Sequence, residues 1–149
     1  MKLELEYSPI TILLAEDDTD DCLFFDKALK EIPIATKLTT VRDGEELMKY
    51  LFANLNNIPT ILFLDLSMPR KTGFECLTEI KENEKLKDLS VVMLSTSFPS
   101  DLNYEKDIVK MLYKIGAAEY IRKPNDFELL KMLILNAIIK IAEEKHLID

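Results

Sequence analysis

Five polar residues lie where short, largely apolar runs end, and their side chains could together handle a phosphoryl group. They are Glu16, Asp17, Asp65, Ser95 and Lys123. A carboxylate is a competent nucleophile toward phosphorus and can form an aspartyl-phosphate. A lysine ammonium group and a bound cation would neutralise charge on the transferring group, and a serine hydroxyl could bond one of its oxygens. The set therefore predicts phosphoryl chemistry at a carboxylate, provided that the fold brings the five residues together.

The three acids of this set also predict a divalent cation. Carboxylates placed side by side repel each other unless positive charge lies between them. Magnesium prefers oxygen ligands and is usually held by one or two carboxylates together with water and phosphate oxygens. Asp17 and Asp65 could be its ligands, and Glu16 could hold a metal-bound water. No histidine or cysteine belongs to the set, which argues against zinc. We therefore expect Mg²⁺, with Mn²⁺ as the alternative.

The elements that must position these residues alternate along the chain. Short, largely apolar runs are typical of strands buried on both faces of a parallel sheet. Stripes at helical spacing separate them, and acidic residues favour helix starts at several points. This order predicts one doubly wound α/β sheet with helices on both faces, whose functional groups meet at the carboxyl ends of the strands. The predicted strands are Ile10–Ala15, Ile34–Val41, Thr60–Leu64, Ser90–Leu94 and Ala118–Arg122. The predicted helix-start acids are Asp18, Asp20, Asp21 and Asp43, and either Asn125 or Asp126 could cap the last helix.

Composition narrows the kinds of partner. The chain has 149 residues and a formal net charge of −8. That length suits one domain, for which we expect residues 9–144, with a loose arm at 1–8, a tail at 145–149 and no output domain. An acidic surface disfavours nucleic acid and anionic membranes. No signal peptide or membrane-spanning run stands out, so we expect a cytoplasmic protein.

Four stretches in order now identify a family resemblance. They are ILLAEDDTDD, LFLDLSMPRKTGFE, VVMLSTS and GAAEYIRKP. Together they resemble the receiver domain of two-component response regulators, over residues 9 to 142. The amino-acid sequence of these stretches most resembles that of single-domain receivers that partner phytochrome-type or hybrid histidine kinases. The resemblance implies a flavodoxin-like (βα)5 fold with strand order 2-1-3-4-5.

The resemblance also implies a role for each matching residue. Asp65 would be the phosphoacceptor, Ser95 the switch hydroxyl and Lys123 the phosphate-binding lysine, joined to Pro124 by a candidate cis bond. Tyr120 would be the switch aromatic residue. The metal set would be Glu16, Asp17, Asp65 and the backbone carbonyl of Ser67.

The family's activity is implied in the same way. A histidine kinase or histidine phosphotransfer protein would donate the phosphoryl group. The domain would be a phosphoacceptor rather than an enzyme, although it would assist its own phosphorylation and dephosphorylation. Its output would be a contact with a downstream protein.

Three rival functions are weaker on the residues. A haloacid-dehalogenase-like phosphatase typically needs a second aspartate two positions after its nucleophile, where this chain has Ser67. A flavodoxin-like cofactor binder needs a phosphate-cradling loop after its first strand, where this chain has acids. A pseudo-receiver scaffold would not need the intact set of acids, hydroxyl and amine.

Two departures from the family pattern concern partner surfaces. The segment Phe98–Tyr104 lengthens the connection after the fourth strand, and it is either a tolerated insertion or a partner contact through Phe98, Leu102 and Tyr104. In the last helix, the stripe Leu130, Ile134, Ala137 and Ile141 should face the sheet. Met132, Leu135 and Ile139 should then face outward, either as scattered surface residues or as an interface for a homodimer, a kinase or an effector.

Overall fold

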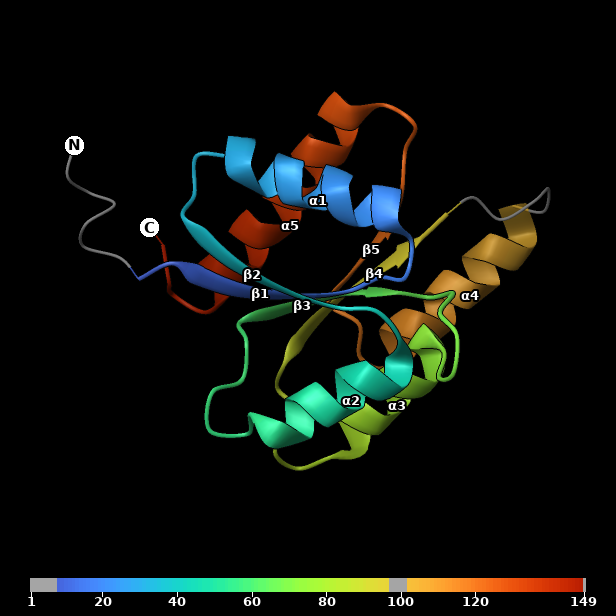
Figure 1. Ribbon diagram of the computed structural model, residues 1–149. Helices are drawn as coiled ribbons and strands as arrows, with labels where there is room; N and C mark the ends of the chain where they lie inside the picture. The colour runs from blue at the N-terminus through green and yellow to red at the C-terminus, as the bar shows by residue number, and fades with distance from the viewer. Residues whose placement is uncertain (1–7, 97–101, 149) are drawn as a thin grey trace.

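Five parallel strands form the centre of the computed structural model, which describes residues 8–96 and 102–148. Their order across the sheet is β2-β1-β3-β4-β5, as expected for the predicted fold (Figure 1). The strands are β1 (Ile10–Ala15), β2 (Thr36–Val41), β3 (Ile61–Asp65), β4 (Ser90–Ser95) and β5 (Glu119–Arg122).

Helices cover both faces of this sheet. Figure 1 shows α1 and α5 on one face and α2, α3 and α4 on the other. Each face has its own core, because alternate side chains of the buried strands point to opposite sides. On the α1 and α5 face, for example, the rings of Phe25 and Phe63 meet edge to face, with their centroids 4.9 Å apart. The helices are α1 (Thr19–Glu31), α2 (Gly44–Ala53), α3 (Gly73–Glu82), α4 (Leu102–Ile115) and α5 (Phe127–Glu144).

Helix starts follow from local hydrogen bonding. The side chain of Asp18 accepts a hydrogen bond from the backbone N–H of Asp21, 2.9 Å away, and so caps α1. Asp43 caps α2 in the same way. Thr72 and Glu75 form a reciprocal capping box at the start of α3. These caps fix the residue at which each helix begins, and they confirm the predicted roles of Asp18 and Asp43.

Some predicted boundaries were off by one or two residues. Asp65 is the last residue of β3 rather than the residue after it, and Ser95 likewise ends β4. Strand β2 begins at Thr36 instead of Ile34.

The last part of the segment Phe98–Tyr104, which was predicted as a loop, is helical. Leu102 begins α4, so the positions up to Tyr104 belong to that helix, and the Tyr104 side chain is exposed. Phe98 lies outside the described residues.

The predicted sheet-facing side of α5 is confirmed, and the predicted outward-facing side is confirmed only in part. Ile134, Ala137 and Ile141 are buried against the sheet. On the outer side, Met132 is 57% exposed. Leu135 is only partly exposed, because it packs against the core beneath. Ile139 is half-buried as well.

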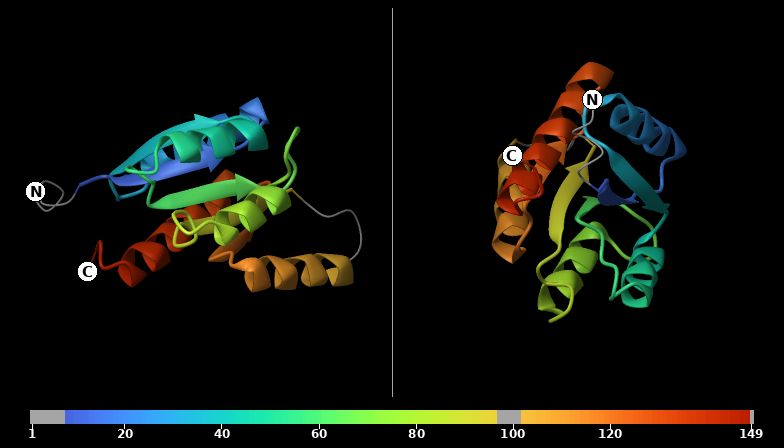
Figure 2. Two further views of the ribbon diagram at one scale, coloured as in Figure 1. Left: turned by 90° about the horizontal axis from the view of Figure 1, so that it is seen from below. Right: turned by 90° about the vertical axis from the view of Figure 1, so that its left-hand side faces the viewer.

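Strand β1 begins and helix α5 ends at the same end of the sheet, away from the carboxyl ends of the strands (Figure 2).

Within the described residues, no helix is long and apolar enough to cross a membrane.

Candidate functional site

The parallel register places the predicted site residues at one edge of the sheet. Asp65 pairs with Leu94, and the next residue, Ser95, pairs with Arg122. Lys123 follows directly, and its backbone N–H donates to the Ser95 carbonyl at 2.7 Å. Residues far apart in the chain therefore converge because their strands end at the same level.

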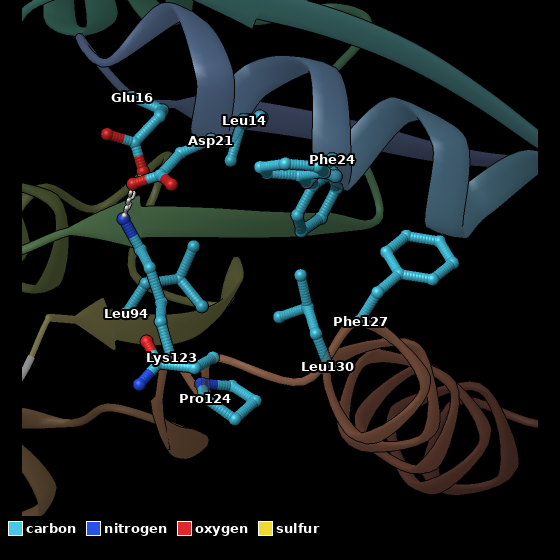
Figure 3. A pocket seen from close by; sticks show the side chains of 11 residues that line it. Leu14, Glu16, Asp21, Phe24, Leu94, Lys123, Pro124, Phe127 and Leu130 are labelled. Atoms are coloured by element: carbon cyan, nitrogen blue, oxygen red, sulfur yellow. Dashed lines mark hydrogen bonds and ion pairs between the residues drawn. The ribbon is translucent and has the colours of Figure 1, made fainter.

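Lys123 is the centre of this cluster. Its ammonium group contacts the Glu16 carboxylate, lies 2.9 Å from Asp21 Oδ2 and lies 3.0 Å from Asp65 Oδ2. Figure 3 shows the Lys123 side chain reaching toward Glu16 and Asp21. The side chains of Glu16 and Asp65 are only 2% and 6% exposed, and that of Lys123 is 12% exposed. Two nearly buried carboxylates thus depend on one ammonium group for neutralisation.

Burial and mutual repulsion shift the titration of the cluster. Burial and the hydrogen-bonded neighbour Asp65 raise the pKa of Glu16 above its usual range, although Lys123 opposes the shift. Burial alone would lower the pKa of Lys123, but the Glu16 hydrogen bond and the Asp65 and Asp21 carboxylates raise it above its usual value. The lysine is therefore held charged, and Glu16 keeps its proton to a higher pH than an ordinary carboxyl group.

The loop after β3 holds the other side of Asp65. The backbone N–H of Ser67 donates to Asp65 Oδ1 at 2.9 Å. Gly73, at the start of α3, packs so closely that a Cβ atom there would lie 2.2 Å from the Asp65 carbonyl oxygen. Only glycine allows this approach, and it lets the loop fold back beside the carboxylate.

A set of hard oxygen donors lies beside the lysine. Carboxylate oxygens of Glu16, Asp17 and Asp65 all lie within 4.8 Å of one another. Asp17 is exposed, so water can complete a coordination sphere there. Nearby acids without nitrogen or sulfur ligands suit magnesium or manganese rather than zinc. The residues present therefore fit the predicted metal.

Arg42, just after β2, fixes the loop that carries Asp17. Its Nη2 atom donates to the Asp17 carbonyl oxygen at 2.8 Å and to Thr19 Oγ1 at 3.1 Å. Its backbone N–H donates to the Glu46 side chain at 3.0 Å, which ties the same residue to α2. This arginine joins two elements across the edge of the site.

The side chains of Ser95 and Tyr120 form a hydrogen bond. The Ser95 hydroxyl is buried and lies 2.6 Å from the Tyr120 hydroxyl. Tyr120 donates in turn to Glu105 Oε2 on α4, 2.8 Å away, and Arg122 lies 3.2 Å from the other Glu105 oxygen. Burial raises the pKa of Tyr120 to about 12; its bond with Ser95 opposes the shift and Glu105 adds to it.

An apolar cavity of about 210 Å³ opens beside the lysine. Figure 3 shows Phe24, Phe127 and Leu130 around it, between α1 and the start of α5. The bond between Lys123 and Pro124, at the wall of this cavity, is trans, so the expected cis bond was wrong. The lysine is aimed instead by its carboxylate partners.

Sequence reasoning missed three residues: Asp21, Arg42 and Glu105. Asp21 precedes the buried Phe25 by four positions and so lies on the core-facing side of α1. Glu105 precedes the buried Leu112 by two helical turns. An acid on the inner face of a helix was the available signal in both cases. No local pattern marks Arg42.

Comparisons with known proteins agree with this geometry. A family model described as "Response regulator receiver domain" matches residues 12–135. The chain is 34% identical over 131 residues to "Response regulator Rcp1" of Synechocystis sp., covering 84% of each protein. It is 32% identical over 135 residues to the "Probable methanogenesis regulatory protein FilR2" of Methanothrix harundinacea, covering 89% of this chain and 83% of the relative.

Solved structures give the same result. The phosphorylated cyanobacterial phytochrome response regulator RcpA superposes with a TM-score of 0.74 at 33% identity, over 87% of this chain and 91% of RcpA. The Mn²⁺-bound form of response regulator Rcp1 superposes with a TM-score of 0.73 at 32% identity, over 86% of this chain and 91% of Rcp1. The likeness extends over most of both chains in each case.

Proposed function

Because this chain belongs to the response regulator receiver domain family, in which a histidine kinase typically phosphorylates an aspartate, we propose that Asp65 is its phosphoacceptor. One observation carries the proposal: Asp65 is a buried carboxylate whose two oxygens contact the Lys123 ammonium group and the Ser67 N–H. The donor is a histidine kinase or a histidine phosphotransfer protein. The phosphorylated domain then signals through contacts with another protein, and we expect this exchange in the cytoplasm.

The chemistry follows from the contacts of Asp65. One carboxylate oxygen attacks phosphorus, the bond between phosphorus and the donor imidazole nitrogen breaks, and the nitrogen keeps the electron pair. Asp65 becomes an acyl phosphate, and Lys123 balances part of the added negative charge. The Ser95 hydroxyl then donates to a phosphoryl oxygen. Water attack on the acyl phosphate later restores the carboxylate and releases inorganic phosphate.

Receiver domains bind Mg²⁺ or Mn²⁺ in an acidic pocket, and four groups of this chain fit that role. They are the carboxylates of Glu16, Asp17 and Asp65, whose oxygens lie close together, and, by its place in the sequence, the backbone carbonyl of Ser67. When bound, the cation neutralises charge on the phosphoryl group and its acceptor. Asp17 and Asp65 would bind it directly, and Glu16 would hold a coordinated water. Arg42 would keep the Asp17 loop in place for binding.

Two surfaces are proposed for protein contacts. One is the outer side of α5, where Met132 is well exposed and Leu135 and Ile139 are half-buried. Its proposed occupants are a second copy of this chain, a kinase or an effector. The other is the first turn of α4, which includes Leu102 and the exposed Tyr104, together with Phe98 earlier in the sequence.

The contacts of Asp65 and Lys123 also weaken two of the rival functions. A phosphatase of the haloacid-dehalogenase type would need an acid at Ser67, which here offers its backbone N–H to Asp65. A scaffold without phosphotransfer would have no use for a largely buried lysine among three carboxylates.

The proposal is tested by intact-mass spectrometry after incubation with acetyl phosphate and Mg²⁺. We expect the mass of one phosphoryl group to be added to the native protein. Asp65→Asn, which preserves size, should add none, and neither should the native protein with a chelator. A full adduct on Asp65→Asn would refute the assignment.

A further inference from the structure

Three polar side chains from three elements form one hydrogen-bonded chain behind the phosphoacceptor. Ser95 ends β4, Tyr120 lies in β5, and Glu105 lies in the first turn of α4. The hydroxyl oxygens of Ser95 and Tyr120 are 2.6 Å apart, and the Tyr120 oxygen is 2.8 Å from Glu105 Oε2. The Glu105 side chain is only 12% exposed, and Arg122 pairs with its second oxygen. The series of hydrogen bonds therefore ends at a shielded, ion-paired carboxylate.

The number of available protons fixes which group donates in each of these hydrogen bonds. An ionised carboxylate can only accept hydrogen bonds, and a tyrosine has one hydroxyl proton. That proton must lie between Tyr120 and Glu105. The short contact between the two hydroxyls then requires the only proton of Ser95 to point at Tyr120. The raised pKa of Tyr120, about 12, keeps its proton in place near neutral pH.

This direction conflicts with the role of Ser95 after phosphorylation. A phosphoryl oxygen is also only an acceptor, so it needs the same Ser95 proton. We propose that Glu105 is a positioning residue: by accepting the Tyr120 proton it commits the Ser95 proton to Tyr120, and it thereby restrains the phosphoryl-bound arrangement. The inference rests on the proposed function, in which Ser95 bonds the phosphoryl group on Asp65.

The restraint is released by breaking either hydrogen bond. If the bond between Tyr120 and Glu105 breaks, Tyr120 can donate to Ser95, and Ser95 can donate to the phosphoryl group. Because Glu105 belongs to α4, this break also removes a hydrogen bond between the first turn of that helix and β5, and leaves the ion pair of Glu105 with Arg122. Occupation of the phosphoryl site is thus coupled to the α4 surface by one carboxylate.

Removing the acceptor should therefore strengthen binding of a phosphoryl mimic. Beryllofluoride, which binds an aspartate oxygen as a phosphoryl group would, is the probe, titrated in the presence of Mg²⁺ and followed by fluorine NMR. Glu105→Ala should tighten its binding about 3- to 10-fold, the equivalent of one hydrogen bond. Glu105→Gln removes the charge but keeps an oxygen that can accept from Tyr120, so it should stay close to the native affinity.

A double-mutant cycle separates this mechanism from a general effect on the fold or charge. In Tyr120→Phe the Ser95 proton is already free, so adding Glu105→Ala should change nothing further. Circular dichroism checks that each variant is folded.

Three results would overturn the inference. They are unchanged or weaker binding by Glu105→Ala, equal tightening by Glu105→Gln, and the same gain in the Tyr120→Phe background. A native protein that binds no beryllofluoride would instead overturn the proposed function of Asp65, so the two failures are distinguishable.

Discussion

Replacing Lys123 with methionine should destabilise the metal-free protein and make Mg²⁺ more stabilising. Lys123 is the cation that the buried carboxylates of Glu16 and Asp65 contact, and Asp21 shares it from the rim. Methionine keeps most of the apolar stem and removes only the charge. The variant therefore leaves two nearly buried acids facing each other without a counter-charge.

The size of the loss follows from breaking a buried ion pair. Removing one partner of such a pair costs about 3–5 kcal/mol, because the remaining charge stays desolvated. We take the lower figure, since Lys123 and Asp21 are partly exposed and Glu16 can take up a proton. A loss of about 3 kcal/mol lowers the Tm of a domain of this size by about 6–12 °C.

Magnesium should reverse much of this loss. In the native protein the cation competes with the Lys123 ammonium group for the same oxygens, whereas in Lys123→Met it does not. Ligand binding stabilises the folded state more as affinity rises, so Mg²⁺ should raise the Tm of the variant more than that of the native protein.

The assay is thermal unfolding by circular dichroism at pH 7.5, with a chelator or with Mg²⁺. Lys140→Met is the matched control, because Lys140 pairs with Glu119 at an exposed position, and it should leave the Tm unchanged within error. If Lys123→Met unfolds at the same temperature as the control, or if Mg²⁺ shifts both proteins equally, the charge balance described here is wrong.

Three further predictions concern other parts of the molecule. Arg42→Gln should weaken Mg²⁺ binding about 3- to 10-fold by calorimetry, because one hydrogen bond to the Asp17 loop is lost. Arg70→Gln is the control and should leave Mg²⁺ binding unchanged, because Arg70 pairs with Asp43 and Glu45 at the start of α2. Tighter binding by Arg42→Gln would mean that only its charge matters. Without metal, the raised pKa of Glu16 means that ionising this residue destabilises the folded state. The free energy of unfolding, measured in urea, should therefore fall as the pH rises above the usual carboxyl range. Glu16→Gln should make the free energy of unfolding depend less on pH. Met132→Glu should leave the Tm unchanged and alter association in light scattering or kinase coupling; no change in either would remove α5 from the proposed interfaces.

Much of the fold could be predicted because its signals are local. The buried strands are runs such as Ile61–Leu64, which are apolar on both faces because helices cover both sides of the sheet. The caps Asp18 and Asp43 mark helix starts within a few residues. Strand ends were less certain, since Asp65 continues the backbone ladder of β3 although its side chain belongs to the site.

The cluster could be predicted only as a list of strand ends. Glu16, Asp65, Ser95 and Lys123 follow apolar runs, so the topology alone brings them together. The partners that orient them come from elsewhere: Asp21 and Glu105 act across helix–sheet contacts, and Arg42 acts from the end of the neighbouring strand. Such contacts depend on helix placement rather than on spacing in the chain, and the outward face of α5 was overestimated for the same reason.

The central claim is that the Asp65 carboxylate takes up the phosphoryl group. The most direct test is to phosphorylate the native chain with acetyl phosphate and Mg²⁺, reduce the acyl phosphate with borohydride, and sequence the peptides by tandem mass spectrometry. Reduction converts a phosphorylated aspartate to homoserine, so we expect homoserine at position 65 and aspartate at positions 17 and 21. Homoserine at either of those positions, or unmodified Asp65 in a protein that carries the phosphoryl group, would contradict it.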